Sequence, residues 1–269
     1  MQTRGADGTD DAVNRRRLLA FAGTAGLAAA LGACSKPMQV ANSVTPHNPT
    51  PPTVTPSIAV PVAPPVETPP PASALSQPII CRSGWGALPA RPGGVPHTLT
   101  QMTIHHTGSA LGDNRNAPAR LRQHQQLHQN DRGWIDIAYH VGVDRNGNIY
   151  ELRDPGLVGD TATEYDPTGH FLVLCEGNFD EEAVTPEQLH GAAMAFAWAA
   201  STFPISPSIV YGHRDFAATA CPGANLYAHV ASGELDRRVN ELLAAGPVNI
   251  RSICGPEAAQ RVAEIEAGG

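Results

Sequence analysis

The segment GHRDFAATACPG, residues 212–223, contains two side chains that could hold one metal ion. His213 and Cys221 lie eight positions apart, and the residues between them are too small and too rich in turn formers for one helix. Imidazole and thiolate are ligands that zinc prefers. Because Pro222 and Gly223 turn the chain, the segment can fold back and bring Cys221 beside His213. The segment therefore indicates two ligands of one site.

A third ligand is offered by the pair His105 and His106, which ends the apolar run MTIHH. His213 also follows an apolar run, IVYG. Strand ends and the loops after them are where open α/β sheets build sites. Two imidazoles and one thiolate make the ligand set of a catalytic zinc, with a fourth position left for water or substrate. An ion held in this way keeps positive charge, so it can polarise a carbonyl and acidify bound water.

Alternating strands and helices are predicted around these residues. Runs rich in β-branched residues predict strands over 102–106, 138–144, 148–152, 171–175 and 208–212, and Asn146-Gly147 predicts a hairpin between the second and third. Helices are predicted from Pro118 through 129, from the capping box at Thr185 to about residue 200, and over 234–244. The expected fold is α/β, with a mixed central sheet flanked by helices.

The first 34 residues predict an export signal. Arg15, Arg16 and Arg17 precede an uncharged stretch over 18–33 that is too short and too glycine-rich for a membrane span. The arginines resemble a twin-arginine signal, and LGAC, which ends at Cys34, resembles a lipobox whose cysteine is lipidated. An ordinary secretory peptide with a chance cysteine is the alternative. In both cases we expect a protein outside the cytoplasm, and the lipobox predicts anchoring to the cell membrane by lipid.

Residues 35–78 predict a disordered linker. They are rich in proline and have a single carboxylate, Glu67, so they cannot bury enough apolar surface to offset their chain entropy. A polyproline-like spacer of this length reaches at most about 130 Å, which suits a target in the cell envelope. Residues 79–269 then form one domain, which we expect to be monomeric. The net charge of −7 gives no basic surface for nucleic acid.

Cysteine usage separates structural from chemical roles. The chain has five cysteines, in a compartment that permits disulfides. Cys81 opens the domain and Cys254 lies near its end, so this pair could join the two ends. Cys175 lies in the apolar run FLVLC and is expected to be a buried thiol, which leaves Cys221 free for chemistry. Two disulfides, one of them using Cys221, are the alternative.

Several motifs together resemble a known family. RSGWGA, IHHTGS, GWIDIAYHVGVDRNGNIYELR and GHRDFAATACPG are similar to motifs of the zinc-dependent N-acetylmuramoyl-L-alanine amidases, the type shared by peptidoglycan recognition proteins and phage lysozyme-like amidases. The resemblance covers about residues 82–227, in the family's order. It implies the fold of that family, zinc as cofactor, and hydrolysis of the amide between N-acetylmuramic acid and L-alanine in peptidoglycan or muropeptides.

The resemblance also implies roles for individual residues. His105, His213 and Cys221 match the zinc ligands, and Tyr139 matches an active-site tyrosine that hydrogen-bonds substrate or water. Thr219 falls where catalytic recognition proteins have threonine, and we expect it to assist Tyr139 in stabilising the oxyanion.

Two departures and two alternatives accompany this interpretation. Related bacterial amidases have a glutamate at what corresponds to Leu174, and the segment GDTATEYDPTGH, residues 159–170, lacks a histidine motif often found there. The proton-transfer group is therefore open, with Glu176 nearby. A non-catalytic module that only binds peptidoglycan, and a zinc amidase acting on another N-acyl substrate, are the competing functions.

Overall fold

The computed structural model describes residues 75–203, 205 and 209–269. The predicted signal peptide, the lipidation site Cys34 and most of the predicted linker lie outside the described residues. The last four linker residues do not fit the prediction, because Leu75–Pro78 belong to strand β1 (Leu75–Ile80). Pro78 is tolerated there because β1 pairs with strand β4 (Ile149–Glu151) only at Ile79 and Ile80, so one side of Pro78 needs no ladder hydrogen bond.

The sheet has seven strands in the order β6-β2-β5-β3-β4-β1-β7. Only the β3–β4 pair is antiparallel, and all other neighbours are parallel, so the predicted mixed sheet is confirmed. The remaining strands are β2 (Gln101–His106), β3 (Val141–Val143), β4 (Ile149–Glu151), β5 (His170–Cys175), β6 (Val210–Gly212) and β7 (Val248–Ile253).

The predicted hairpin is confirmed. It joins β3 to β4, with the Gly147 N–H donating to the Asp144 carbonyl (3.0 Å). Gly147 has a φ of +78°, and a Cβ there would lie 2.6 Å from the Glu187 carbonyl oxygen. Glycine is therefore required both by the turn and by the close approach of the next helix.

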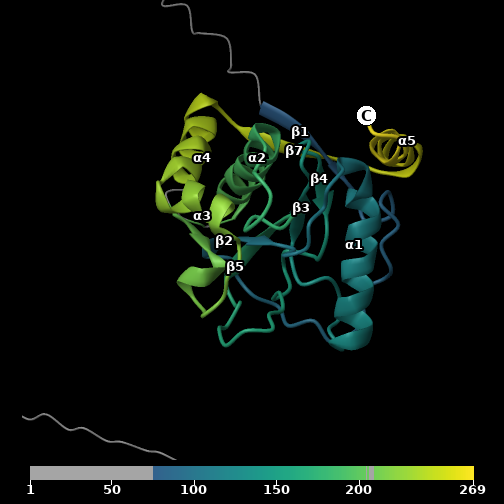
Figure 1. Cartoon of the computed structure of the whole chain (residues 1–269), viewed down its shortest axis with the longest axis horizontal. Coiled ribbons are helices and arrows are strands. Elements are labelled where there is room, and N and C mark those ends of the chain that lie inside the picture. Colours follow the sequence, from purple (N-terminus) through teal and green to yellow (C-terminus); the bar gives the residue numbers. More distant parts are fainter. Residues whose placement is uncertain (1–74, 204, 206–208) are drawn as a thin grey trace, which may run out of the picture. The chain divides into compact units, whose positions relative to one another are not determined.

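Helices cover both faces of the sheet (Figure 1). One face packs against α2 (Pro186–Thr202), α3 (Ala224–Ala231) and α4 (Glu234–Ala245), which share one buried cluster with Met102, Val173 and Phe171. The opposite face packs against α1 (Ala117–Gln126) and α5 (Gly255–Glu266), in a second cluster that contains Trp85 and Leu174. Cys175 is a buried free thiol, as predicted.

The start of α2 differs in one detail from the capping box predicted there. Thr185 caps the helix by accepting from the Gln188 N–H (3.1 Å), as expected. The Gln188 side chain does not return to Thr185. It donates instead to the backbone carbonyls of Val143 (3.1 Å) and Glu176 (3.0 Å), and it thereby ties α2 to the ends of two strands.

The C-terminal part adds elements that the sequence patterns did not predict. Strand β7 pairs with β1 along its whole length, and α5 packs on α1 and on the 3-10 turn η1 (Asn114–Asn116). Cys81 and Cys254 form a disulfide that joins the end of β1 to the start of α5. Among the described residues, no helix has both the length and the apolar character needed to cross a bilayer.

Candidate metal centre

Strand register brings the first two predicted ligands together. His105 lies near the carboxyl end of β2, and His213 begins the 3-10 turn η3 (His213–Asp215) directly after β6. Strands β2 and β6 are parallel neighbours with Ile104 opposite Gly212, so both histidines emerge at the same edge. Their ring centroids are 4.7 Å apart.

Backbone hydrogen bonds return Cys221 to the same place. The Arg214 N–H donates to the Cys221 carbonyl (3.0 Å), which closes the segment between His213 and Cys221. The Sγ of Cys221 lies 3.7 Å from Nδ1 of His105 and accepts from the His106 N–H at 3.4 Å. One donor atom from each of His105, His213 and Cys221 lies within 4.8 Å of the other two. The fold thus assembles all three predicted ligands in one buried cluster.

The electrostatics of the cluster suit a soft cation. Burial lowers the pKa of His105 well below its usual value and that of His213 to about 4, so both imidazoles are neutral and keep a lone pair at neutral pH. Burial raises the pKa of the Cys221 thiol to about 12, although the His106 N–H and the Arg214 guanidinium lower it in part. A thiol in such surroundings ionises when a cation is bound beside it.

One buried atom in the cluster is unsatisfied. Nε2 of His105 has no hydrogen-bond partner among the described residues. The other ring nitrogen, Nδ1, faces the Cys221 sulfur, so within the part of the chain that the structure describes the His105 ring has no hydrogen bond to nitrogen or oxygen that would compete with a metal. The donor set is consistent with the zinc-binding site of an amidase.

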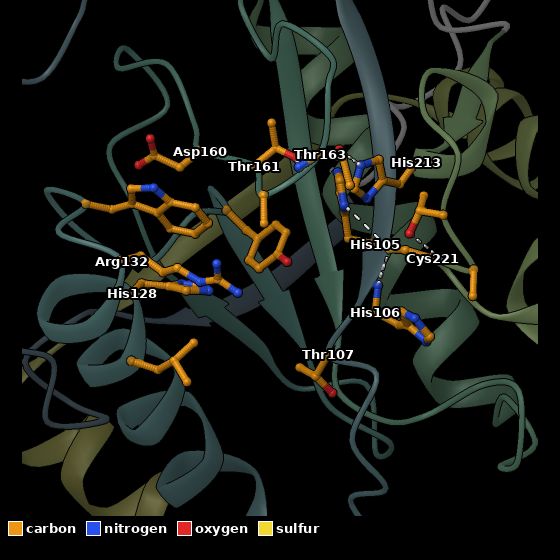
Figure 2. Close-up of a pocket in the computed structure, with 16 residues that line it drawn as sticks. His105, His106, Thr107, His128, Arg132, Asp160, Thr161, Thr163, His213 and Cys221 are labelled. Atoms are coloured by element: carbon orange, nitrogen blue, oxygen red, sulfur yellow. Dashed lines mark hydrogen bonds between the residues drawn. The ribbon is translucent and has the colours of Figure 1, made fainter. Parts of the chain in front are cut away.

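The cluster forms one wall of an open cavity of about 270 Å³. Figure 2 shows His105, His213 and Cys221 on one side of this cavity, with His128 and Arg132 on the other. Asp160 has the only carboxylate among the described residues that line the cavity, and it forms an ion pair with Arg153 (2.5 Å). The cavity is also lined by His106, Thr107, Leu127, Trp134, Tyr139, Thr161, Ala162, Thr163, Thr219 and Ala220.

Tyr139 and Thr219 both line the cavity. The Tyr139 ring lies 5.0 Å from that of His105, and burial raises the pKa of its hydroxyl, so it remains protonated and able to donate. The Thr219 hydroxyl accepts from the Cys221 N–H (3.2 Å), which steadies the ligand loop and leaves the hydroxyl proton free. These positions are compatible with the roles implied by the resemblance.

A buried polar network fixes the loop that carries Tyr139. The carboxylate of Asp136 accepts from Gln125 (2.7 Å) and pairs with Arg82 (2.8 Å). Arg153 donates to the backbone carbonyls of Ile137 (2.8 Å) and Asp136 (3.0 Å). The sequence offered no periodic signal for this network, although Arg82 and Asp136 lie within the quoted motifs.

Neither Leu174, which stands where related amidases have a glutamate, nor the nearby Glu176 lines the cavity. Leu174 is fully buried in the same core cluster as Leu121 and Trp85. Glu176 is also fully buried, and neither carboxylate oxygen has a hydrogen-bond partner among the described residues. Neither position therefore supplies a carboxylate to the cavity lining.

Comparison with known proteins agrees with this geometry. A family model described as N-acetylmuramoyl-L-alanine amidase matches residues 96–224, which include His105, His213 and Cys221. Peptidoglycan recognition protein 1 of Mus musculus is 31% identical over 160 residues, which cover 58% of this chain and 87% of that protein. The chain belongs to this amidase family.

Other family members show the same relationship. Peptidoglycan-recognition protein SC2 of Drosophila melanogaster is 31% identical and is matched over 82% of its length and 55% of this chain. The solved structure of Drosophila PGRP-LB aligns with a TM-score of 0.52 at 27% identity, over 94% of that chain and 58% of this one. Peptidoglycan recognition protein LE has been solved in complex with tracheal cytotoxin, a monomeric diaminopimelic acid-type peptidoglycan. That structure aligns with a TM-score of 0.53 at 28% identity, over 92% of that chain and 57% of this one.

The family is thus described by an amidase activity, whereas the relatives compared above are named for recognising peptidoglycan. Helices α4 and α5 and strand β7 lie beyond the residues that the amidase model matches. The three candidate ligands, His105, His213 and Cys221, all lie inside the matched region.

Proposed function

We propose that this family member is a zinc-dependent N-acetylmuramoyl-L-alanine amidase, which hydrolyses the amide between N-acetylmuramic acid and the L-alanine of the stem peptide. The observation that carries the proposal is the contact of Cys221 with His105 inside a buried three-donor cluster. A module that only binds muropeptide gains nothing from a third soft ligand. An amidase needs three ligands and an open fourth position.

The roles of the residues follow from their positions. His105, His213 and Cys221 would hold zinc, which when bound supplies a Lewis acid that polarises the amide carbonyl and acidifies water. The His106 N–H donates to Sγ of Cys221 and stabilises its negative charge. Tyr139 and Thr219 each present a hydroxyl proton to the cavity, where it can be donated to the oxygen that gains charge.

The test combines metal analysis with product analysis. The purified protein should contain one equivalent of zinc and should release free L-alanine amino termini from muropeptides, as read by mass spectrometry. Cys221→Ser removes the soft ligand and should abolish both zinc retention and cleavage. Cys175→Ala removes the other free thiol among the described residues, which lies outside the cluster, and should retain both.

Two results would decide against the proposal. Wild-type protein that binds muropeptides without zinc, or that leaves them intact when loaded with zinc, would favour the binding module. Faster cleavage of simple N-acyl amino acids than of muropeptides would favour a zinc amidase with another substrate.

We also propose that the enzyme acts outside the cytoplasm as a lipid-anchored protein. The support is the sequence of residues 1–34, with arginines before an uncharged stretch that ends in LGAC. Replacing Arg15 and Arg16 by lysine should retain the precursor in the cytoplasm, and Cys34→Ala should prevent labelling by a radioactive fatty acid. Unchanged export and unchanged labelling would each contradict one part of this proposal.

A further inference from the structure

The segment 161–165 has three half-buried side chains near the proposed metal ligands. Thr161, Thr163 and Tyr165 are half-buried, whereas Ala162 and Glu164 between them are exposed. Two of them, Thr161 and Thr163, line the same cavity as the three proposed ligands.

Thr163 contacts one of these ligands directly. Its hydroxyl lies 2.7 Å from Nε2 of His213, and Figure 2 shows Thr163 and Cys221 on different sides of the His213 ring. The Thr163 hydroxyl also lies 2.7 Å from that of Thr161, which additionally accepts from the Thr163 N–H (3.1 Å). The two hydroxyls and the imidazole thus form one continuous hydrogen-bonded chain.

Metal binding by His213 would fix which group donates in each of these hydrogen bonds. A neutral imidazole has one N–H and one lone pair, and a nitrogen that binds metal must present the lone pair. With Nε2 occupied by Thr163, Nδ1 is the nitrogen of His213 that remains for a metal. Nε2 must then bear the proton and donate to Thr163, whose own proton has Thr161 as its acceptor.

The neighbouring tyrosine limits the orientation of the same ring. The centroid of the Tyr165 ring lies 5.0 Å from that of His213 and 5.8 Å from that of Phe216, which follows η3. Rotation of the imidazole would therefore break the Thr163 hydrogen bond and displace packed rings. Groups that fix the orientation and tautomer of a histidine ligand raise its affinity for metal.

We propose that Thr163, itself oriented by Thr161, is a positioning residue that holds His213 with Nδ1 directed at the metal centre. This inference rests on the proposed zinc site and names the group that prepares one of its ligands. It also assigns a role to residues 159–170, which lack the histidine motif often found in related enzymes.

The test measures zinc affinity and the tautomer of His213 in parallel. Zinc affinity is measured by competition with a chromogenic chelator, for wild type, Thr163→Val and Thr163→Ser. Loss of the hydroxyl in Thr163→Val should weaken zinc binding by roughly 10- to 100-fold, as for other partners of metal-bound histidines. Thr163→Ser retains the hydroxyl and should bind zinc as the wild type does. Thr202→Val, on the exposed end of α2, is the matched control and should change nothing.

The tautomer is read from metal-free protein labelled with 15N-histidine. Long-range proton–nitrogen correlation spectra should show His213 protonated at Nε2 in wild type and Thr163→Ser, and a mixture of tautomers in Thr163→Val. Equal zinc affinity and an equal tautomer in wild type and Thr163→Val would overturn the inference, as would equal weakening by valine and serine. Wild type that binds no zinc but shows the Nε2 tautomer would refute the proposed function, because the spectra test the Thr163 contact without metal.

Discussion

Replacing Glu176 by glutamine should remove a pH-dependent loss of stability. Glu176 follows β5, is fully buried, and has no hydrogen-bond partner for either carboxylate oxygen among the described residues. Burial raises its pKa to about 8, although Arg120 and the nearby Thr107 hydroxyl lower it in part, and the charge of Asp144 adds to the increase. The Thr107 hydroxyl is not a hydrogen-bond partner of the carboxylate, because it donates to the carbonyl of Gly177 (3.0 Å). Nδ1 of His124 lies 3.8 Å from Oε1 of Glu176, but burial lowers the pKa of His124 to about 4. The imidazole and the carboxyl are therefore both mainly neutral at pH 7 and form no ion pair.

The magnitude follows from linkage between protonation and folding. In the unfolded chain the carboxyl has its usual value of 4.5, so the folded state holds a proton that the unfolded state loses. Because the folded pKa is the higher one, the penalty is absent below pH 4.5, grows as the pH rises, and levels off above pH 8. At pH 7 the free energy of unfolding is lower by about 3 kcal/mol than it would be with a permanently neutral group.

The assay compares urea unfolding of metal-free wild type and Glu176→Gln between pH 4.5 and 7.5 at constant ionic strength. Buried histidines titrate in both proteins and cancel in the difference. The difference in free energy of unfolding should therefore shift by about 3 kcal/mol in favour of glutamine between pH 4.5 and 7. Glu187→Gln, an exposed carboxylate on α2, is the control and should show no such shift. A flat difference for Glu176→Gln would refute the assignment of a neutral buried carboxyl.

Three further predictions concern the active-site loop and the C-terminal elements. Tyr139→Phe should lower kcat for muropeptides by roughly 100-fold or more with unchanged zinc content, because one oxyanion donor is lost; an unchanged kcat would remove Tyr139 from the mechanism. Asp136→Asn should lower the free energy of unfolding by about 3 kcal/mol, because Arg82 loses its charged partner. The variant should also cleave more slowly, because the loop that holds Tyr139 loosens. Urea unfolding and measurement of kcat test these two effects, and a variant as stable and as active as wild type would contradict the network. The double variant Cys81→Ser/Cys254→Ser should lower the free energy of unfolding by up to about 5 kcal/mol, since the disulfide closes a separation of 173 residues. Urea unfolding that gives the same stability for the oxidised wild type and the double variant would show that β7 and α5 stay packed on the domain without the disulfide.

The sequence by itself determined the fold class and which residues are candidate metal ligands. Residue types fix which atoms can bind a metal, so His105, His213 and Cys221 could be named from the MTIHH and GHRDFAATACPG motifs and their resemblance to a family. Local hydrophobic patterns fix strands and helices through contacts close in the chain, and these predicted β2, β5, α2 and α4 and the β3–β4 hairpin. Helix α5 was not predicted, although Pro256 at its start and the spacing of Val262 and Ile265 are local signals for a helix.

Only the tertiary structure decided the contacts between distant segments. The separation of 116 residues between His105 and Cys221 closes through the β2–β6 register, which no local pattern encodes. The pairing of Pro78-containing β1 with β7 depends equally on a distant strand. The hydrogen bond between His213 and Thr163 and the burial of the Glu176 carboxyl depend on which groups surround a side chain after folding. Burial and hydrogen bonding are properties of the packed chain, and they determine how residues named from the sequence can act.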